Sequence, residues 1–312
     1  MHRLRLILFR MLQLLPVLVG ISVIAFLLLK LSPGDPVRML LGDRATEEAI
    51  AAVRERYGLD QPLLQQYLVY IKNLLAGDLG QSIRYRIPVG QLILQYLPRT
   101  LLLMGYVLAL TLPATIALAI VAARHQGRWP DQVIRGLAVC GMTVPVFWLG
   151  IMLSRLLGVE LGWFPVSGYG NSFLGHLHHL FLPALSTAVW LVPILVRNLR
   201  AAIMEQMEAD YVVASRSKGL PERYIFLQHI LMNSLLPTLH LLGVIVASLI
   251  GGTVIVEIVY AVPGLGSLMV SSVIARDYAV VQGLTLYYAL GTILVTLTVD
   301  ILTTLIDPRV EA

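Results

Sequence analysis

Few side chains in this sequence could take part in chemistry, and none is surrounded by the partners that catalysis needs. Glu257 and Asp300 are acids inside long apolar runs, where an ionisable side chain usually marks an ion or proton path. Each lies close to one end of its run, where water can reach it. The sequence therefore predicts no buried relay of acids and bases. We interpret Asp300 as a polar contact between helices.

His176, His178 and His179 form a cluster of potential metal ligands. Imidazole suits nickel, copper or zinc, so a transient metal site is one interpretation. The simpler interpretation is a solvated loop just before an apolar run, and we expect no metal site. The single cysteine, Cys140, excludes a disulfide framework and a multi-cysteine metal site.

The sequence also lacks the short motifs of nucleotide-binding proteins and hydrolases. No G-x-x-x-x-G-K-[S/T] occurs, and Lys218-Gly219 has the wrong order for one. H-E-x-x-H and G-x-S-x-G are absent as well. We therefore expect no catalytic residue and no cofactor in this chain.

A turn motif follows Glu257 closely. Pro263-Gly264-Leu265-Gly266 forces a turn at one mouth of the predicted helix bundle. We interpret Glu257, Pro263, Gly264 and Gly266 as an outer gate. Gly264 is expected to adopt a positive φ, which would disfavour a β-branched residue there.

The most informative polar stretch is 201–236. The spacing predicts a short helix, and Arg216 and Lys218 in its last turn suit the helix dipole. Gly219 would supply the left-handed residue that ends this helix, and Pro221 with Glu222 would begin a second one. The expected apolar faces are Met204, Met207, Tyr211, Ala214 and Ser215 on the first helix, and Ile225, Phe226 and Ile230 on the second. Docking to a partner protein and lying among lipid headgroups fit this pair equally well.

The elements that must position these residues are membrane spans. Of 312 residues, 57% are hydrophobic and only 13% are charged, about half the charged share of a soluble domain. This excludes disorder, a collagen-like repeat and most cytosolic enzymes. The net charge of +5 orients spans more often than it binds nucleic acid, so no nucleic-acid partner is expected. Six apolar segments are long enough to span a bilayer: 11–31, 100–123, 133–157, 181–200, 236–259 and 283–306.

The basic residues predict the orientation of these spans. With the N-terminus in the cytoplasm, the two short outer loops hold only Arg155 and Arg276, and the remaining short segments are rich in arginine. Both termini are therefore expected in the cytoplasm. The first span follows a basic start but is too long for a cleaved signal, so it is interpreted as a retained signal anchor. In the long first outer loop, 45–57 and 62–76 have helical spacing and predict a small helical subdomain.

The stretch from Asp210 to Leu220 resembles the cytoplasmic signature loop of ABC importer permeases, the Glu-Ala-Ala…Gly motif. It is most similar to the peptide and nickel branch, which tends to read D-Y-V-x-x-A-R-A-K-G. Val213 replaces the motif's Glu, as is common in that branch, and Gly219 matches its Gly. Other stretches agree in order and spacing over nearly the whole chain. They include the outer-loop signature Asp35, Pro36, Gly58, Asp60, Pro62, Gly77, Asp78 and Gly80, the gate residues, Arg276-Asp277-Tyr278 and Asp307-Pro308-Arg309.

The resemblance implies an all-α integral membrane protein of the bacterial inner membrane, with about six transmembrane helices in the type I ABC importer permease fold. It implies a small helical periplasmic subdomain after the first span, on the B-type side of a permease pair. The expected partners are a second homologous permease, two ATPase subunits that bind ATP and Mg²⁺, and an extracytoplasmic solute-binding protein. The expected parts are 1–31 (N-terminus and first span), 32–99 (outer loop), 100–306 (permease core) and 307–312 (tail). The ATPase-coupling loop is 201–235, with Asp210, Tyr211, Ala214, Arg216, Lys218, Gly219, Pro221 and Glu222.

The predicted function is translocation of di- or oligopeptides driven by the partner ATPases. The same machine importing nickel or another small solute, such as glutathione, remains the first alternative, since the solute-binding protein largely sets the substrate in this family. A proton-driven secondary carrier would need a titratable relay within the membrane. A membrane enzyme would need a nucleophile and a base, and neither pattern is found.

Overall fold

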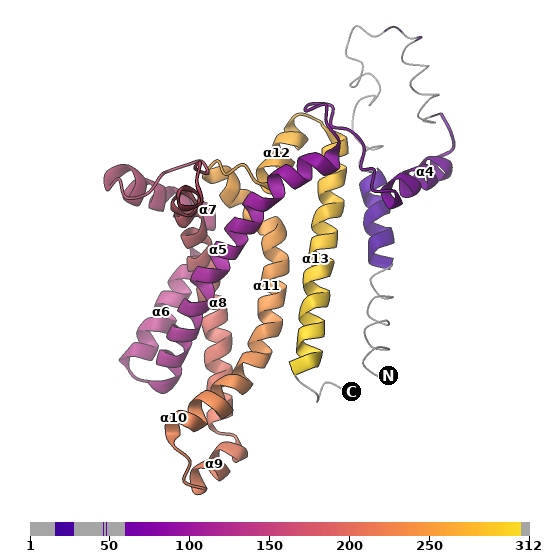
Figure 1. Cartoon of the computed structure of the whole chain (residues 1–312). Coiled ribbons are helices and arrows are strands. Elements are labelled where there is room, and N and C mark those ends of the chain that lie inside the picture. The colour runs from indigo at the N-terminus through magenta and orange to yellow at the C-terminus, as the bar shows by residue number, and fades with distance from the viewer. Residues whose placement is uncertain (1–15, 28–45, 47, 49–59, 307–312) are drawn as a thin grey trace. The chain divides into compact units, whose positions relative to one another are not determined.

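The computed structural model describes residues 16–27, 46, 48 and 60–306, and the regular elements of these residues are helices (Figure 1). One isolated antiparallel bridge joins Gln81 and Pro88. The predicted helix 45–57, apart from residues 46 and 48, lies outside the described residues, as do the tail 307–312 and the signature residues Asp35, Pro36 and Gly58. The first predicted span is described only over Pro16–Leu27, which is an apolar helix.

The long helices confirm most of the predicted spans. They are α5 (Val89–Arg124), α8 (Phe173–Met207), α11 (Met232–Val259) and α13 (Tyr278–Ile306). Each belongs to a helical segment that is long and apolar enough to cross a bilayer. The shorter helices are α4 (Leu63–Leu75), α6 (Trp129–Thr143), α7 (Val146–Leu153), η1 (Ser154–Glu160), α9 (Asp210–Ser217), α10 (Glu222–Tyr224), η2 (Ile225–Leu231) and α12 (Leu265–Ile274), where η marks a π-helix.

The predicted span 133–157 is not one continuous helix. The chain breaks between α6 and α7, and the two halves of this span are bent by 100°. Val144 has φ −84° and ψ 123°, the extended conformation that a following proline imposes. Pro145 then precedes α7, where its missing N–H costs no helical bond. This segment is a broken span or a re-entrant element.

Three helices begin well before their predicted spans. α5 begins at Val89, α8 at Phe173 and α13 at Tyr278, so polar residues that were expected in loops continue the helices. Prolines inside α8 do not end it. At one of them, Ser186 Oγ and Thr187 Oγ1 donate to the carbonyl oxygen of Pro183 at 2.9 and 3.0 Å. These buried hydroxyl groups thereby bond to the helix backbone itself.

The chain forms two compact units. The first comprises 1–98 and 264–293, and the second comprises 99–263 and 294–312. The core of the first unit joins the start of α5 to α12 and the start of α13. Its buried members are Val89, Leu92, Ile93, Leu265, Leu268, Val280 and Leu284. Gly283 permits this packing, because a Cβ there would lie 2.6 Å from a methyl group of Val89.

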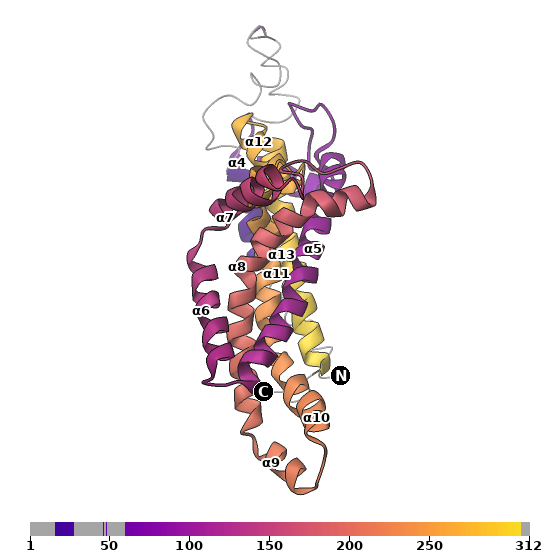
Figure 2. The same cartoon turned by 90° about the vertical axis from the view of Figure 1, so that its left-hand side faces the viewer.

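In the second unit α8 is the central helix. It packs against α6 and α11, and the figures show these three running alongside one another (Figures 1 and 2). Leu195, Leu199 and Ile203 of α8 are fully buried. α6 packs closely on α8 at Gly141, where a Cβ would lie 3.1 Å from both the Pro193 ring and the Val189 carbonyl oxygen. The unit is therefore built outward from α8.

Candidate functional site

The predicted helix–glycine–helix element lies at one end of the second unit, between α8 and α11 (Figures 1 and 2). α9 ends at Ser217, and Gly219 follows with φ +75°. The Gly219 N–H donates to Arg216 O at 2.9 Å and the Leu220 N–H to Ser215 O at 3.3 Å, which is a Schellman ending. The left-handed residue expected from the sequence is confirmed. No atom lies within 4 Å of the place where a Cβ would stand, so only the backbone conformation constrains this glycine.

The buried side of this element differs from the expected one. Val212 is the buried residue of α9, whereas Tyr211 and Ala214 are exposed. The expected face assumed one continuous helix from Met204, but α8 ends at Met207 and α9 begins anew at Asp210. That break changes which side chains turn inward. In the second helix Ile225, Phe226 and Ile230 are buried as expected, in a core shared with Leu199 and Ile203 of α8.

The outer side of the element combines apolar and charged residues. Its exposed large apolar side chains are Tyr211, Val213, Leu220, Tyr224 and Leu227. Across the glycine, the Arg216 guanidinium donates to Glu222 Oε1 at 2.8 Å, and both side chains are substantially exposed. Asp210 lies in the first turn of α9 and Lys218 at its C-cap. An intramolecular ion pair therefore spans the two helices, while apolar side chains beside it stay uncovered.

Side-chain contacts fix the two helices of this element to the helix bundle. The Tyr211 hydroxyl donates to Gln206, and the Asn233 amide donates to that hydroxyl at 3.2 Å and to His229 O at 2.7 Å. Arg124, at the end of α5, lies 4.1 Å from the centroid of the Phe226 ring. A pocket of about 570 Å³ opens here, lined by Arg124, Met207, Arg216, Glu222, Arg223, Phe226, Leu227 and Ile230. This arrangement presents a rigid surface, suited to receiving a protein partner.

At the other end of the unit, Glu257 of α11 is fully buried. Thr100 Oγ1 of α5 donates to Glu257 Oε1 at 2.7 Å, and Thr253 Oγ1 lies 3.4 Å from the same oxygen. The preceding residue, Arg99, donates to the carbonyl oxygen of Pro263 at 3.1 Å. Two consecutive residues of α5 therefore hold both ends of the Glu257–Pro263 segment.

The turn after α11 has its left-handed residue at a different position from the one expected. Ala261, not a glycine, adopts the left-handed conformation at φ +49°, and the Val262 N–H donates to Glu257 O at 2.8 Å. Gly264 has φ −103° and ψ −175°, an extended conformation at the N-cap of α12. The expectation of a positive φ at Gly264 is wrong, and so is the strain argument built on it. Gly266 is buried in the first turn of α12.

The described outer-loop signature residues surround α4. Asp60 and Pro62 precede the helix, and Gly77 ends it with φ +80°. Asp78 Oδ1 then accepts the N–H of Gly80 at 2.8 Å. These residues shape the backbone around α4, and no chemical role follows from their contacts.

The three histidines are bound to backbone carbonyl groups. Ring nitrogens of His176, His178 and His179 lie 2.8–2.9 Å from the carbonyl oxygens of Tyr169, Trp163 and Gly175. His176 also stacks on the Tyr169 ring at 4.0 Å. Partial burial raises the pKa of that tyrosine, although the nearby charge of Arg99 lowers it. Within the described residues, no group of three His, Cys, Asp or Glu side chains is placed to hold a metal ion.

Two buried acids were missed by sequence reasoning. Asp131, fully buried in the first turn of α6, accepts both donors of Arg200 at 2.7 Å and the Gly127 N–H at 2.9 Å. Asp277, almost fully buried, accepts from Ser82 Oγ and from the Arg84 N–H. Asp131 directly follows a Trp-Pro start signal, which could have marked it as an N-terminal acid. No local signal names partners 69 or 195 residues away.

Comparison with known proteins identifies the family of this chain. Residues 115–312 match the family model described as the binding-protein-dependent transport system inner membrane component, and residues 3–104 match the N-terminal model of such membrane components. The chain therefore belongs to the family of inner-membrane permeases of binding-protein-dependent ABC importers. This family provides the transport subunit, which works with an ATPase and a solute-binding protein.

Several relatives match over nearly their full length. A permease protein assigned to a peptide transport system in Brucella suis biovar 1 (strain 1330) is 41% identical over 98% of both chains. The oligopeptide transport system permease protein of Bacillus subtilis (strain 168) is 35% identical over 97% of this chain and 98% of its own. The glutathione transport system permease protein of Escherichia coli O6:H1 is 37% identical over 97% of each.

One solved structure supports the fold. It is titled an amino acid ABC transporter with histidines, and it superposes with a TM-score of 0.52 at 15% identity. The match covers 70% of this chain and 94% of that one. The predicted importer permease fold is confirmed.

Proposed function

We propose that this chain is a transmembrane permease subunit that moves di- or oligopeptides across the bacterial inner membrane. The observation that carries the proposal is the hinged pair formed by α9 and by α10 with its continuation η2, which has a buried inner side and an uncovered apolar and charged outer side. A lipid-facing pair would not need an intramolecular ion pair at its outer edge. The peptide substrate is supported by the names of the Brucella suis and Bacillus subtilis relatives.

The proposed assembly contains a second, homologous permease, two ATPase subunits and an extracytoplasmic solute-binding protein. ATP and Mg²⁺ are bound by the ATPases, since this sequence has no phosphate-binding loop. The surface that contacts an ATPase is made by Asp210, Tyr211, Ala214, Arg216, Lys218, Gly219, Pro221 and Glu222. Both termini lie in the cytoplasm in this proposal, on the same side as α9.

An outer gate is proposed around Glu257, Pro263, Gly264 and Gly266. The buried bond between Thr100 and Glu257 supports it, because it joins the outer part of α5 to α11. Opening this end requires that bond and the Arg99–Pro263 bond to move together or to break. During alternating access, motion of the ATPases would be transmitted through α11 to this segment.

A reconstituted complex tests the substrate. Proteoliposomes with both permeases, the ATPases and the cognate binding protein should accumulate labelled dipeptide only when ATP is present. Permease alone should show neither uptake nor ATP hydrolysis. Turnover of ATP by this chain alone, free of contaminants, would contradict the proposal.

Glutathione is the second candidate, because one relative at 37% identity is named for it. Nickel is supported by no relative described above. Uptake of labelled glutathione or nickel that excess dipeptide does not reduce would replace the peptide assignment, while leaving the ABC permease assignment intact.

A further inference from the structure

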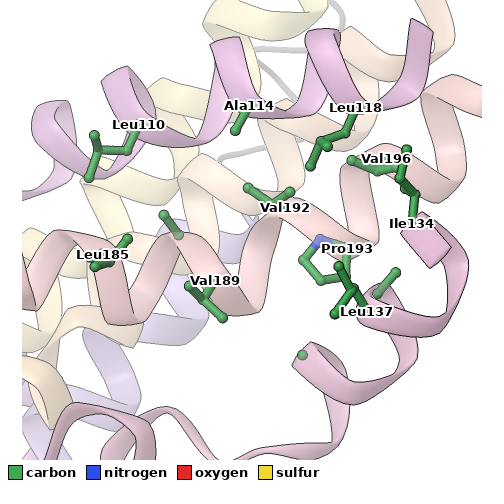
Figure 3. A pocket seen from close by; sticks show the side chains of 13 residues that line it. Leu110, Ala114, Leu118, Ile134, Leu137, Leu185, Val189, Val192, Pro193 and Val196 are labelled. Carbon is green, nitrogen blue, oxygen red and sulfur yellow. The ribbon is translucent and has the colours of Figure 1, made fainter. Parts of the chain in front are cut away.

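An apolar groove of about 440 Å³ runs along the second unit between α5, α6 and α8 (Figure 3). Every residue that lines it is apolar or glycine. Leu110 and Leu185 mark one end, and Leu118, Ile134 and Val196 mark the other (Figure 3). At 1.5 Å per residue, the lined stretches of α5 and α8 extend about 12 and about 17 Å. That length matches the hydrocarbon thickness of one bilayer leaflet, about 15 Å.

Basic residues gather at one end of this groove. α6 begins there, with Arg128 at its N-cap and Trp129 next, 76% exposed. Arg135 follows Ile134 on α6; its side chain is 57% exposed and its Nε lies 3.6 Å from Asp131 Oδ1. Asp131, buried beside these arginines, also accepts the two-pronged bond from Arg200, so one acid stands against three arginines. The net charge at this end is therefore positive.

From this juxtaposition we propose that the groove binds one anionic phospholipid, with an acyl chain between α5, α6 and α8 and the phosphate near Arg128 and Arg135. The apolar lining excludes a polar solute, and its length along the helices suits one acyl chain. The exposed tryptophan at the charged end fits the headgroup level, where tryptophan is enriched. Basic pockets between membrane helices are known to hold anionic headgroups.

α6 lies on α8 beside the groove and is fixed there at two points. α6 is held on α8 at Gly141 and again at the Asp131–Arg200 ion pair. Between these two points Ile134, Leu137 and Ala138 line the groove. The site is therefore a preformed opening between two fixed contacts.

Native mass spectrometry of the full complex in detergent tests the proposal, with dioleoyl phosphatidylglycerol and dioleoyl phosphatidylcholine offered at equal concentration. We expect one phosphatidylglycerol to be retained in preference to phosphatidylcholine. Arg128→Gln with Arg135→Gln should reduce this preference about 30-fold, since each of the two cations near the headgroup contributes about 1 kcal/mol. Ala138→Trp should fill the groove and remove the bound lipid.

Two control variants match these changes. Arg155→Gln removes an exposed arginine that pairs with Glu160 and does not line the groove. Leu242→Trp fills a separate apolar pocket between α5, α8 and α11. Neither should alter phosphatidylglycerol retention. Equal retention of the two lipids, or equal loss in the control variants, would overturn the proposal.

A photo-crosslinker at Leu137, 67% exposed on α6, distinguishes the occupants directly. A lipid adduct supports the proposal. An adduct with another protein chain, whether the second permease or a second copy of this chain, would show that protein covers the groove and would refute it. These experiments do not measure peptide uptake, so a result that refutes lipid binding leaves the transport proposal standing.

Discussion

At the scale of single residues, one helix ending recurs among the described helices, with glycine at some of the places and without it at two. Gly77 and Gly219 take the left-handed position after α4 and α9. Ala261 and Arg276 take the same position after α11 and α12, with φ of +49° and +56°. A non-glycine residue in this region costs of order 1–3 kcal/mol. The two strained endings border α12, the helix that follows the proposed outer gate.

Gly219→Val should impair coupling through backbone strain alone. Because no atom would contact a new Cβ, the cost comes from the left-handed conformation, about 1–2 kcal/mol. Gly219→Asn is the matched control, since asparagine tolerates this conformation. We expect the valine variant to insert normally and bind loaded binding protein, yet to lose ATPase on co-purification or to hydrolyse ATP without transport. Equal transport by both variants would contradict the assignment.

At the scale of elements, the sequence predicted helices wherever a long apolar run occurred, because bilayer thickness sets the length of a span. It failed where the outcome depends on contacts distant in sequence. Pro145 produces a 100° bend only because Val144 adopts the extended alternative, whereas Pro183 and Pro193 remain inside α8. A local pattern does not distinguish these prolines. The glycine hinge was predictable, since the residues that indicate it, Gly219, Pro221 and Glu222, are neighbours in the sequence.

The Asp131–Arg200 pair fixes α6 to α8, so Asp131→Asn should destabilise the chain strongly. Removing one partner of a buried ion pair leaves a charge uncompensated, which costs about 3–5 kcal/mol. Arg200 is only 17% exposed, so water recovers little of this loss. Glu160→Gln is the control, because Glu160 and Arg155 are both exposed and such pairs contribute about 1 kcal/mol or less. Thermal unfolding in detergent should show a large drop only for Asp131→Asn, and equal midpoints would refute this role.

At the scale of the whole molecule, the second unit carries the proposed coupling surface at one end and the proposed gate segment at the other. α11 connects them, with η2 leading into it and Glu257 near its far end. Ile225, Phe226 and Ile230 of η2 are buried against α8, so a push on the hinged pair is passed to packed helices rather than absorbed by a loose loop. The transport proposal therefore depends on what the outer side of α9 and α10 contacts.

A charge swap separates the partner contact from the internal ion pair. Glu222→Arg alone removes the partner of Arg216, so its effect would mix two causes. Arg216→Glu combined with Glu222→Arg keeps the internal pair and inverts the charges presented outward. The pair is exposed and contributes about 1 kcal/mol or less, so the thermal midpoint should stay close to that of the unmodified chain. If an ATPase docks here, co-purification and transport should fall in the swap, because like charges then meet across the contact. If α9 and α10 lie among lipid headgroups instead, the swap variant should transport normally, since the swap leaves the net charge of the surface unchanged. That result would refute the coupling proposal.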